Sequence, residues 1–169
     1  LQLPTVAVTI ATYKRPGGLE RALNSLSRQC HTDFNNIHVS IVNDGSHDDE
    51  YQTVVDRSWP FNLDYIPRER DEQDRPRVYS SRNLAVGGSR GEVIWIVDDD
   101  LYFDEHTLFI LRLYHAMLAE QRPVLIPHNA DTSEPWHYQN PFPFFASPRD
   151  RLGVWVSFAG ASLWRKDFD

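Results

Sequence analysis

The chain has 169 residues, of which 41% are hydrophobic and 24% are charged. That size and composition can bury one substantial core, so we expect a single globular domain over residues 1–169. The net charge of −7, without any basic run, argues against a nucleic-acid partner. A single cysteine, Cys30, excludes an internal disulfide, and no apolar segment reaches the roughly 18 residues of a membrane span.

Strand-like and helix-like segments alternate along the chain. Apolar runs predict buried strands at Val6–Ala11, Glu92–Val97 and Val124–Ile126. Further strands are expected at Ile37–Val42, which alternates in part, at Asn62–Ile66, and at Gly153–Phe158, which alternates. Amphipathic spacing predicts helices at Leu19–Arg28, Asp48–Arg57, Val78–Ser89 and His106–Glu120. The alternation implies an α/β fold with a mainly parallel or mixed sheet and helices on both faces.

Three segments are expected to be irregular. Thr12–Gly18 carries a proline and two glycines and is interpreted as a turn. Pro67–Arg77 is dense in charge and is expected to be an exposed loop. Asn129–Arg151 is rich in proline and aromatic residues without any period, which is typical of a functional or disordered loop.

Three consecutive carboxylates, Asp98–Asp100, follow the predicted strand Glu92–Val97. Open α/β sheets bind ligands at the carboxyl ends of their strands. Three acids at such an end repel one another, and a hard cation such as Mn²⁺ or Mg²⁺ relieves this by binding carboxylate oxygens. A solvated acidic turn before the next helix explains the same pattern, and this stretch alone does not decide between them.

Asp44 closes the predicted strand Ile37–Val42, so its carboxylate should lie on the same sheet edge as the three acids. A carboxylate there can accept hydrogen bonds from ribose hydroxyls or a base edge. The alternative is an Asx turn within Asn43–Ser46, and the two interpretations are compatible.

Arginine and aromatic side chains supply further candidates. The arginines that could contact a diphosphate through forked donors are Arg68, Arg70, Arg75, Arg77 and Arg82. We expect the first three to belong to a solvated loop and retain Arg77 and Arg82. Trp136 and Tyr138 are the best candidates for stacking on a sugar. The histidines show no HExxH spacing and no pairing with cysteines, which disfavours zinc, and no dinucleotide fingerprint follows Ala11.

Several segments, in order, resemble the family 2 glycosyltransferases. They are Val8–Arg15, Ile41–Asp48, Arg82–Ala85 with Gly91–Asp100, and Phe158–Lys166. The resemblance implies a GT-A fold, a nucleotide-diphospho-sugar donor and a Mn²⁺ or Mg²⁺ ion at a DXD-type motif. By motif position, Thr12, Asp44 and Asp98 should bind the nucleotide, and Tyr13, Arg15, Arg77 and Arg82 are expected at the same site. Asp99 or Asp100 should hold the metal, and Trp136 and Gly160 should lie on the sugar side.

The resemblance stops short of the family's acceptor-side acids, so we expect a chain truncated on that side. No catalytic base is assigned, because no motif supports Asp131, Glu134 or Asp150. Family members usually invert the anomeric centre. A UDP-sugar is the commonest donor, the acceptor could be a carbohydrate, a lipid-linked molecule or a protein, and a cytoplasmic location with peripheral membrane contact is expected. The alternatives are a sugar nucleotidyltransferase and a non-catalytic nucleotide- or carbohydrate-binding module.

Overall fold

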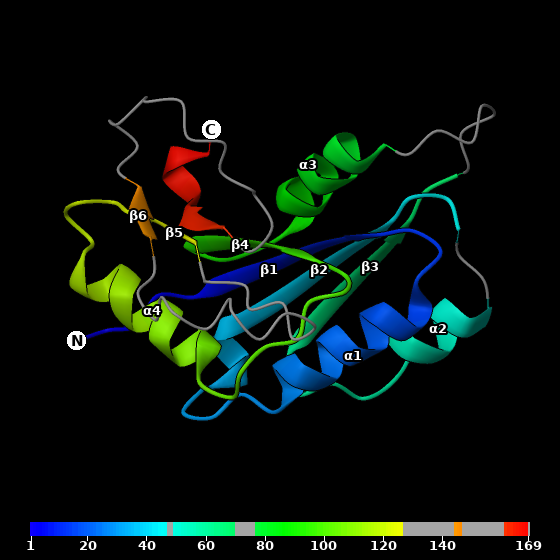
Figure 1. The fold of residues 1–169 in the computed structure, drawn as a ribbon, viewed down its shortest axis with the longest axis horizontal. Helices are drawn as coiled ribbons and strands as arrows, with labels where there is room; N and C mark the ends of the chain where they lie inside the picture. The colour runs from blue at the N-terminus through cyan, green and yellow to red at the C-terminus, as the bar shows by residue number, and fades with distance from the viewer. Residues whose placement is uncertain (47–48, 70–76, 127–143, 147–160, 169) are drawn as a thin grey trace, which may run out of the picture.

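A computed structural model describes residues 1–46, 49–69, 77–126, 144–146 and 161–168. These residues form a seven-stranded sheet in the order β3-β2-β1-β4-β7-β5-β6 (Figure 1). The strands are β1 (Val6–Thr12), β2 (Ile37–Asn43), β3 (Asn62–Pro67), β4 (Val93–Asp98), β5 (Val124–Ile126), β6 (Phe144–Ala146) and β7 (Ser162–Trp164). The helices are α1 (Pro16–Ser27), α2 (Asp49–Val55), α3 (Val78–Gly88) and α4 (Thr107–Met117), with short 3₁₀ turns η1 (Phe34–Asn36) and η3 (Arg165–Asp167).

The sheet is mixed, and its parallel half places the acidic strand ends together. β1 lies between β2 and β4 and pairs in parallel with both, and β2 pairs in parallel with β3. β7 is antiparallel to β4 and β5. In this register Ala11 is opposite Asp98 and Thr12 is opposite Asn43. Asp44 and Asp98 therefore share one edge, and the predicted α/β architecture is confirmed.

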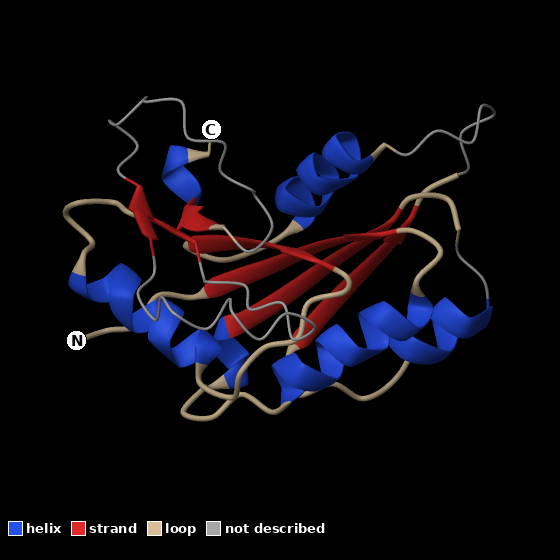
Figure 2. Ribbon diagram, in the orientation of Figure 1, coloured by secondary structure: helices blue, strands red, loops and turns tan. Residues whose placement is uncertain are grey.

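Helices cover both faces of the sheet, as expected (Figure 2). Helices α1, α2 and α4 lie on one face, where Val8, Trp95 and Leu108 belong to the main core cluster. Helix α3 lies on the other face, where Val86 packs against Ile94. Because neighbouring residues of β4 point to opposite faces that are both covered, this strand is apolar without alternation. Along the described part of the chain, no helix has the length and apolar character needed to cross a membrane.

The predicted turn at Thr12–Gly18 is wrong in its second half, because α1 already begins at Pro16. Proline suits the first helical position, where its fixed φ is favourable and its missing N–H costs nothing. Gly18 belongs to this first turn because space is short: a Cβ atom there would lie 3.0 Å from the backbone oxygen of Asp99. The absence of a side chain at Gly18 allows α1 to pack closely against the turn that contains Asp99. The glycine therefore serves this close approach and does not interrupt the helix.

Two short strands were not predicted. β6 lies inside the segment expected to be a loop, and β7 follows the expected strand Gly153–Phe158, which lies outside the described residues. Each has three residues, too few to show a hydrophobic period. Both are defined by antiparallel pairing, β6 with β5 and β7 with β4, so long-range contacts determine them.

Candidate functional site

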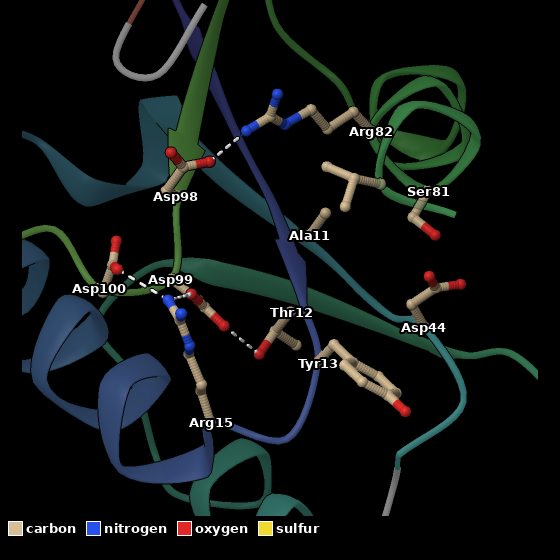
Figure 3. A pocket seen from close by; sticks show the side chains of 11 residues that line it. Ala11, Thr12, Tyr13, Arg15, Asp44, Ser81, Arg82, Asp98, Asp99 and Asp100 are labelled. Atoms are coloured by element: carbon tan, nitrogen blue, oxygen red, sulfur yellow. Dashed lines mark hydrogen bonds and ion pairs between the residues drawn. The ribbon is translucent and has the colours of Figure 1, made fainter. Parts of the chain in front are cut away.

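A cavity of about 300 Å³ opens at the carboxyl edge of the parallel strands (Figure 3). Its predicted lining residues are Thr12, Tyr13, Arg15, Asp44, Arg82, Asp98, Asp99 and Asp100. Ala11, Val78 and Ser81 complete the lining and were not predicted. The cavity thus unites the ends of β1, β2 and β4 with the start of α1 and one side of α3. Trp136 and Gly160 lie outside the described residues.

Asp99 is the innermost of the three consecutive acids and is only 6% exposed. Its Oδ2 accepts a hydrogen bond of 2.6 Å from the Thr12 hydroxyl. Burial raises the pKa of Asp99 above its ordinary value, while the Thr12 bond and the Arg15 charge oppose that shift. A buried carboxyl with a perturbed pKa inside a cleft is typical of a functional site.

Tyr51 organises the residues around Asp99. Its hydroxyl lies 2.8 Å from the Thr12 hydroxyl and accepts a 2.8 Å bond from the backbone N–H of Arg15. The side chain is fully buried beneath the pocket. The sequence analysis did not single out Tyr51, since no local signal shows that its hydroxyl reaches β1.

Asp100 points outward and pairs with Arg15. The Arg15 Nη1 donates a 2.7 Å hydrogen bond to Asp100 Oδ2 and lies 3.6 Å from Asp99 Oδ1. The Asp100 side chain is 52% exposed, whereas that of Asp99 is 8% exposed. Arg15 therefore neutralises part of the negative charge that these two neighbours would otherwise concentrate.

The donor chemistry of this edge fits a hard divalent cation. Mg²⁺ is commonly held by one or two carboxylates while substrate phosphates and water fill its other positions. Asp100 offers an accessible oxygen within the pocket, and Asp99 lies next to it. In the described residues, these acids do not converge as a set of three metal ligands. The arrangement suits a cation shared with a phosphorylated ligand.

Asp44 is also buried, and Arg77 holds it in place. The Arg77 backbone N–H donates to Asp44 Oδ2 at 2.6 Å, and its Nε donates to Oδ1 at 3.1 Å. The turn that follows β2 is closed by Asn43, whose Oδ1 accepts from the backbone N–H of Ser46 at 3.0 Å. The Asx turn is therefore made by Asn43, which leaves the Asp44 carboxylate directed at the pocket (Figure 3).

Two further arginines stand at the pocket. Arg82 donates from Nη2 to Asp98 Oδ1, and its buried Nε has no hydrogen-bond partner among the described residues. Arg68 was expected to be solvated, but its Nη1 donates to Ser81 Oγ at 2.7 Å and lies 3.5 Å from Asp44. That expectation was wrong because the Arg68 backbone continues the edge beyond β3, bonding to the Asn43 carbonyl at 2.9 Å. Arg70 and Arg75 lie outside the described residues.

The fold is the GT-A fold of glycosyltransferases. The model of glycosyl transferase family 2 matches residues 7–167, and the chain belongs to that family. This confirms the resemblance found in the sequence. A comparison with curated protein sequences found no match.

Solved structures share the fold. A crystal structure of S. aureus TarS aligns with a TM-score of 0.60 and 24% identity over 77% of this chain and 22% of that one. TarS in complex with UDP-GlcNAc aligns with a TM-score of 0.57 and 25% identity over 72% and 33%. The mannosyltransferase PcManGT from Pyrobaculum calidifontis, in complex with GDP-Man and Mn²⁺, aligns with a TM-score of 0.60 and 19% identity. That alignment covers 76% of this chain and 36% of the mannosyltransferase chain. The chain therefore spans roughly a fifth to a third of the length of these proteins.

Proposed function

We propose that this domain transfers a sugar from a nucleotide-diphospho-sugar to an acceptor hydroxyl, with inversion and with Mn²⁺ or Mg²⁺ as cofactor. The observation that carries the proposal is the pocket itself. It sets carboxylates from the ends of β2 and β4 against the guanidinium groups of Arg15 and Arg82. A nucleotide diphosphate needs both kinds of group, because its base and ribose donate hydrogen bonds while its phosphates accept them.

The polar groups divide the pocket into two parts. Asp44 retains acceptor capacity beyond its bonds to Arg77, since each carboxylate oxygen has two lone pairs, and would bind the nucleoside with Thr12 and Tyr13. Asp98 would accept from the ribose. Arg82, whose guanidinium group lines the pocket, would bind the diphosphate. Trp136 and Gly160 remain proposed for the sugar side.

Asp100, with Asp99 beside it, would hold the metal ion. When bound there, the ion would supply positive charge that stabilises the leaving diphosphate. In the structure, Arg15 pairs with both Asp99 and Asp100. With the metal ion and the nucleotide bound, its guanidinium group would turn toward the phosphates. In the transfer, the acceptor oxygen bonds to the anomeric carbon as the bond to the diphosphate breaks with its electron pair. A carboxylate base takes the hydroxyl proton, and the described residues do not assign it.

The structure favours this proposal over a sugar nucleotidyltransferase. Such an enzyme would need a glycine- and basic-rich loop after the first strand, whereas Pro16, Gly17 and Gly18 form the first turn of α1. A non-catalytic binding module remains the second candidate. A UDP-sugar is the preferred donor within the proposal, supported by the structure of TarS with UDP-GlcNAc.

The first test is calorimetric titration of UDP, UMP and GDP into the chain, with Mn²⁺ and with chelator. We expect Mn²⁺ to raise the affinity for UDP at least about tenfold, about 1.4 kcal/mol, because the cation offsets the desolvation of the diphosphate. UMP, with one phosphate, should gain much less. Failure of every nucleotide to bind would refute the proposal, and binding without turnover of any UDP-sugar would favour the binding module.

Asp44→Asn should weaken UDP binding about tenfold, and equally with Mn²⁺ and with chelator. A carboxylate accepts hydrogen bonds at two oxygens, whereas the amide of asparagine accepts at only one. The neutral amide also no longer balances the positive charges of Arg68 and Arg77. The matched control is Asp64→Asn, because Asp64 also pairs with an arginine, Arg90, but does not line the pocket. Unchanged UDP affinity in Asp44→Asn, or a loss confined to the Mn²⁺ titration, would contradict the nucleoside assignment.

A further inference from the structure

A cysteine, a glutamate and a histidine lie close together at the end of α1 opposite to Arg15. Cys30 follows the helix, and Glu105 and His106 immediately precede α4. The Cys30 sulfur, a carboxylate oxygen of Glu105 and a ring nitrogen of His106 all lie within 4.8 Å of one another. We propose that these three residues bind a zinc-type transition-metal ion at a site separate from the nucleotide pocket.

Backbone contacts hold the two segments together before any metal binds. The Cys30 N–H donates to the Glu105 carbonyl at 2.6 Å. The buried Gln29 side chain donates to the Asp104 carbonyl at 2.6 Å and accepts from the Leu108 N–H at 2.8 Å. The loop after α1 and the start of α4 are thus fixed next to each other, so little chain entropy opposes closure of the site.

The three ligand types select the class of metal. A thiolate and an imidazole favour zinc and similar borderline ions, whereas Mg²⁺ and Mn²⁺ prefer oxygen ligands alone. Zinc bonds of about 2.0–2.3 Å space tetrahedral ligands about 3.3–3.8 Å apart. Because the three ligand atoms lie within 4.8 Å of one another, no pair needs to close by more than about 1.5 Å. Glu105 and His106 are accessible enough to move, with side chains 64% and 43% exposed. A water would complete the coordination.

The neighbouring ring of His31 helps to orient His106. The two rings stack with centroids 5.7 Å apart, and His31 has a left-handed φ of 54°. The simplest competing explanation is a surface ion pair, since His106 Nε2 lies 3.4 Å from Glu105 Oε1. Sequence spacing disfavoured zinc because a motif search requires neighbouring ligands, whereas here two segments far apart in the chain supply them.

The test uses Co²⁺ and Zn²⁺ with the reduced chain. Cys30 is the only cysteine, so every thiol signal reports this site. We expect one equivalent of Co²⁺ to produce a sulfur-to-cobalt charge-transfer band, and one equivalent of Zn²⁺ to slow maleimide labelling of Cys30 at least about tenfold, because the bound thiolate no longer attacks. Absence of the band, or unchanged labelling, would overturn the proposal.

Variants distinguish a metal site with three protein ligands from nonspecific metal binding by the Cys30 thiol alone. His106→Ala should lower Co²⁺ affinity at least about tenfold, with the fold checked by circular dichroism, because one of three protein ligands is lost. Glu120→Gln, at an exposed acid beyond α4, is the control and should bind as the unmodified chain does. Equal Co²⁺ affinity in His106→Ala would refute the site. Cys30→Ser should abolish the cobalt band but retain Mn²⁺-dependent UDP binding, so this test is independent of the proposed transferase function.

Discussion

Asp100→Asn is expected to abolish most of the gain in UDP affinity that Mn²⁺ provides, while weak metal-free binding persists. The variant loses the most accessible negative charge among the three consecutive acids and keeps the volume of the side chain. Without a cation, no positive charge offsets the free-energy cost of desolvating the diphosphate, so UDP binds weakly. The expected loss is at least about tenfold in the presence of Mn²⁺, or about 1.4 kcal/mol.

Calorimetry of UDP binding, with Mn²⁺ and with chelator, checks this result. Asp64→Asn again serves as the control for removal of a half-exposed, arginine-paired carboxylate. Asp99→Asn should behave differently from Asp100→Asn, because Asp99 is buried against Thr12 and its replacement also disturbs the support of the pocket. If both variants keep the full Mn²⁺ enhancement, the metal site is misassigned and the acidic turn is only a solvated helix start.

The edge that carries this site could be predicted from the sequence because its determinants are local. The apolar runs before Asp44 and Asp98 define strands, and alternation with helices makes those strands parallel. Parallel strands bring their carboxyl ends to one edge, so the two acids meet without any knowledge of side-chain packing. The register of β1 with β2 and β4 then places Thr12 and Asp98 within the same pocket.

The partners of these acids could not be predicted, because contacts between distant segments decide them. Nothing near Asp99 in the sequence indicates that Thr12 donates to it or that Tyr51 supports Thr12. Arg68 looked like part of a charged loop, although backbone pairing beyond β3 brings it to Asp44. Strand β7 was missed for the same reason.

The different surroundings of Asp98, Asp99 and Asp100 are the clearest feature that the sequence could not predict. The sequence allowed any of them to bind a metal, since each follows the same strand. In the structure Asp98 pairs with Arg82, Asp99 turns inward, and Asp100 stays accessible. Because β4 ends at Asp98 and the chain turns at Asp99 and Asp100, the three side chains have different surroundings although they are neighbours in the sequence.

A second large effect should come from His115, which is fully buried on α4. Its Nε2 lies 2.9 Å from the hydroxyl of Ser162 on β7, and that hydroxyl donates to the Leu125 carbonyl on β5 at 3.4 Å. The histidine therefore donates through Nε2, and its buried Nδ1 has no partner among the described residues. Protonation would place a second N–H there without an acceptor.

Burial lowers the pKa of His115 from 6.5 to about 4. Between these values the unfolded chain binds a proton that the folded chain does not, so stability should fall as the pH drops from about 6.5 to about 4. A difference of about 2.5 pKa units corresponds to about 3 kcal/mol of unfolding free energy, fully lost below the folded-state pKa. Above the unfolded-state pKa this contribution to the pH dependence disappears.

We would measure urea unfolding of the unmodified chain and of His115→Gln at several pH values. The difference between the two proteins isolates the contribution of His115 to the pH dependence of stability, because all other titrating groups are present in both. Glutamine is neutral at every pH and can still donate to the Ser162 hydroxyl. At pH 8 the two proteins should differ only by the packing change, and the variant should gain relative stability as the pH approaches 4. Parallel stability curves over that range would show that His115 accepts a proton in the folded state, which would place its ring in contact with water or an acid rather than in the dry space between α4 and β7.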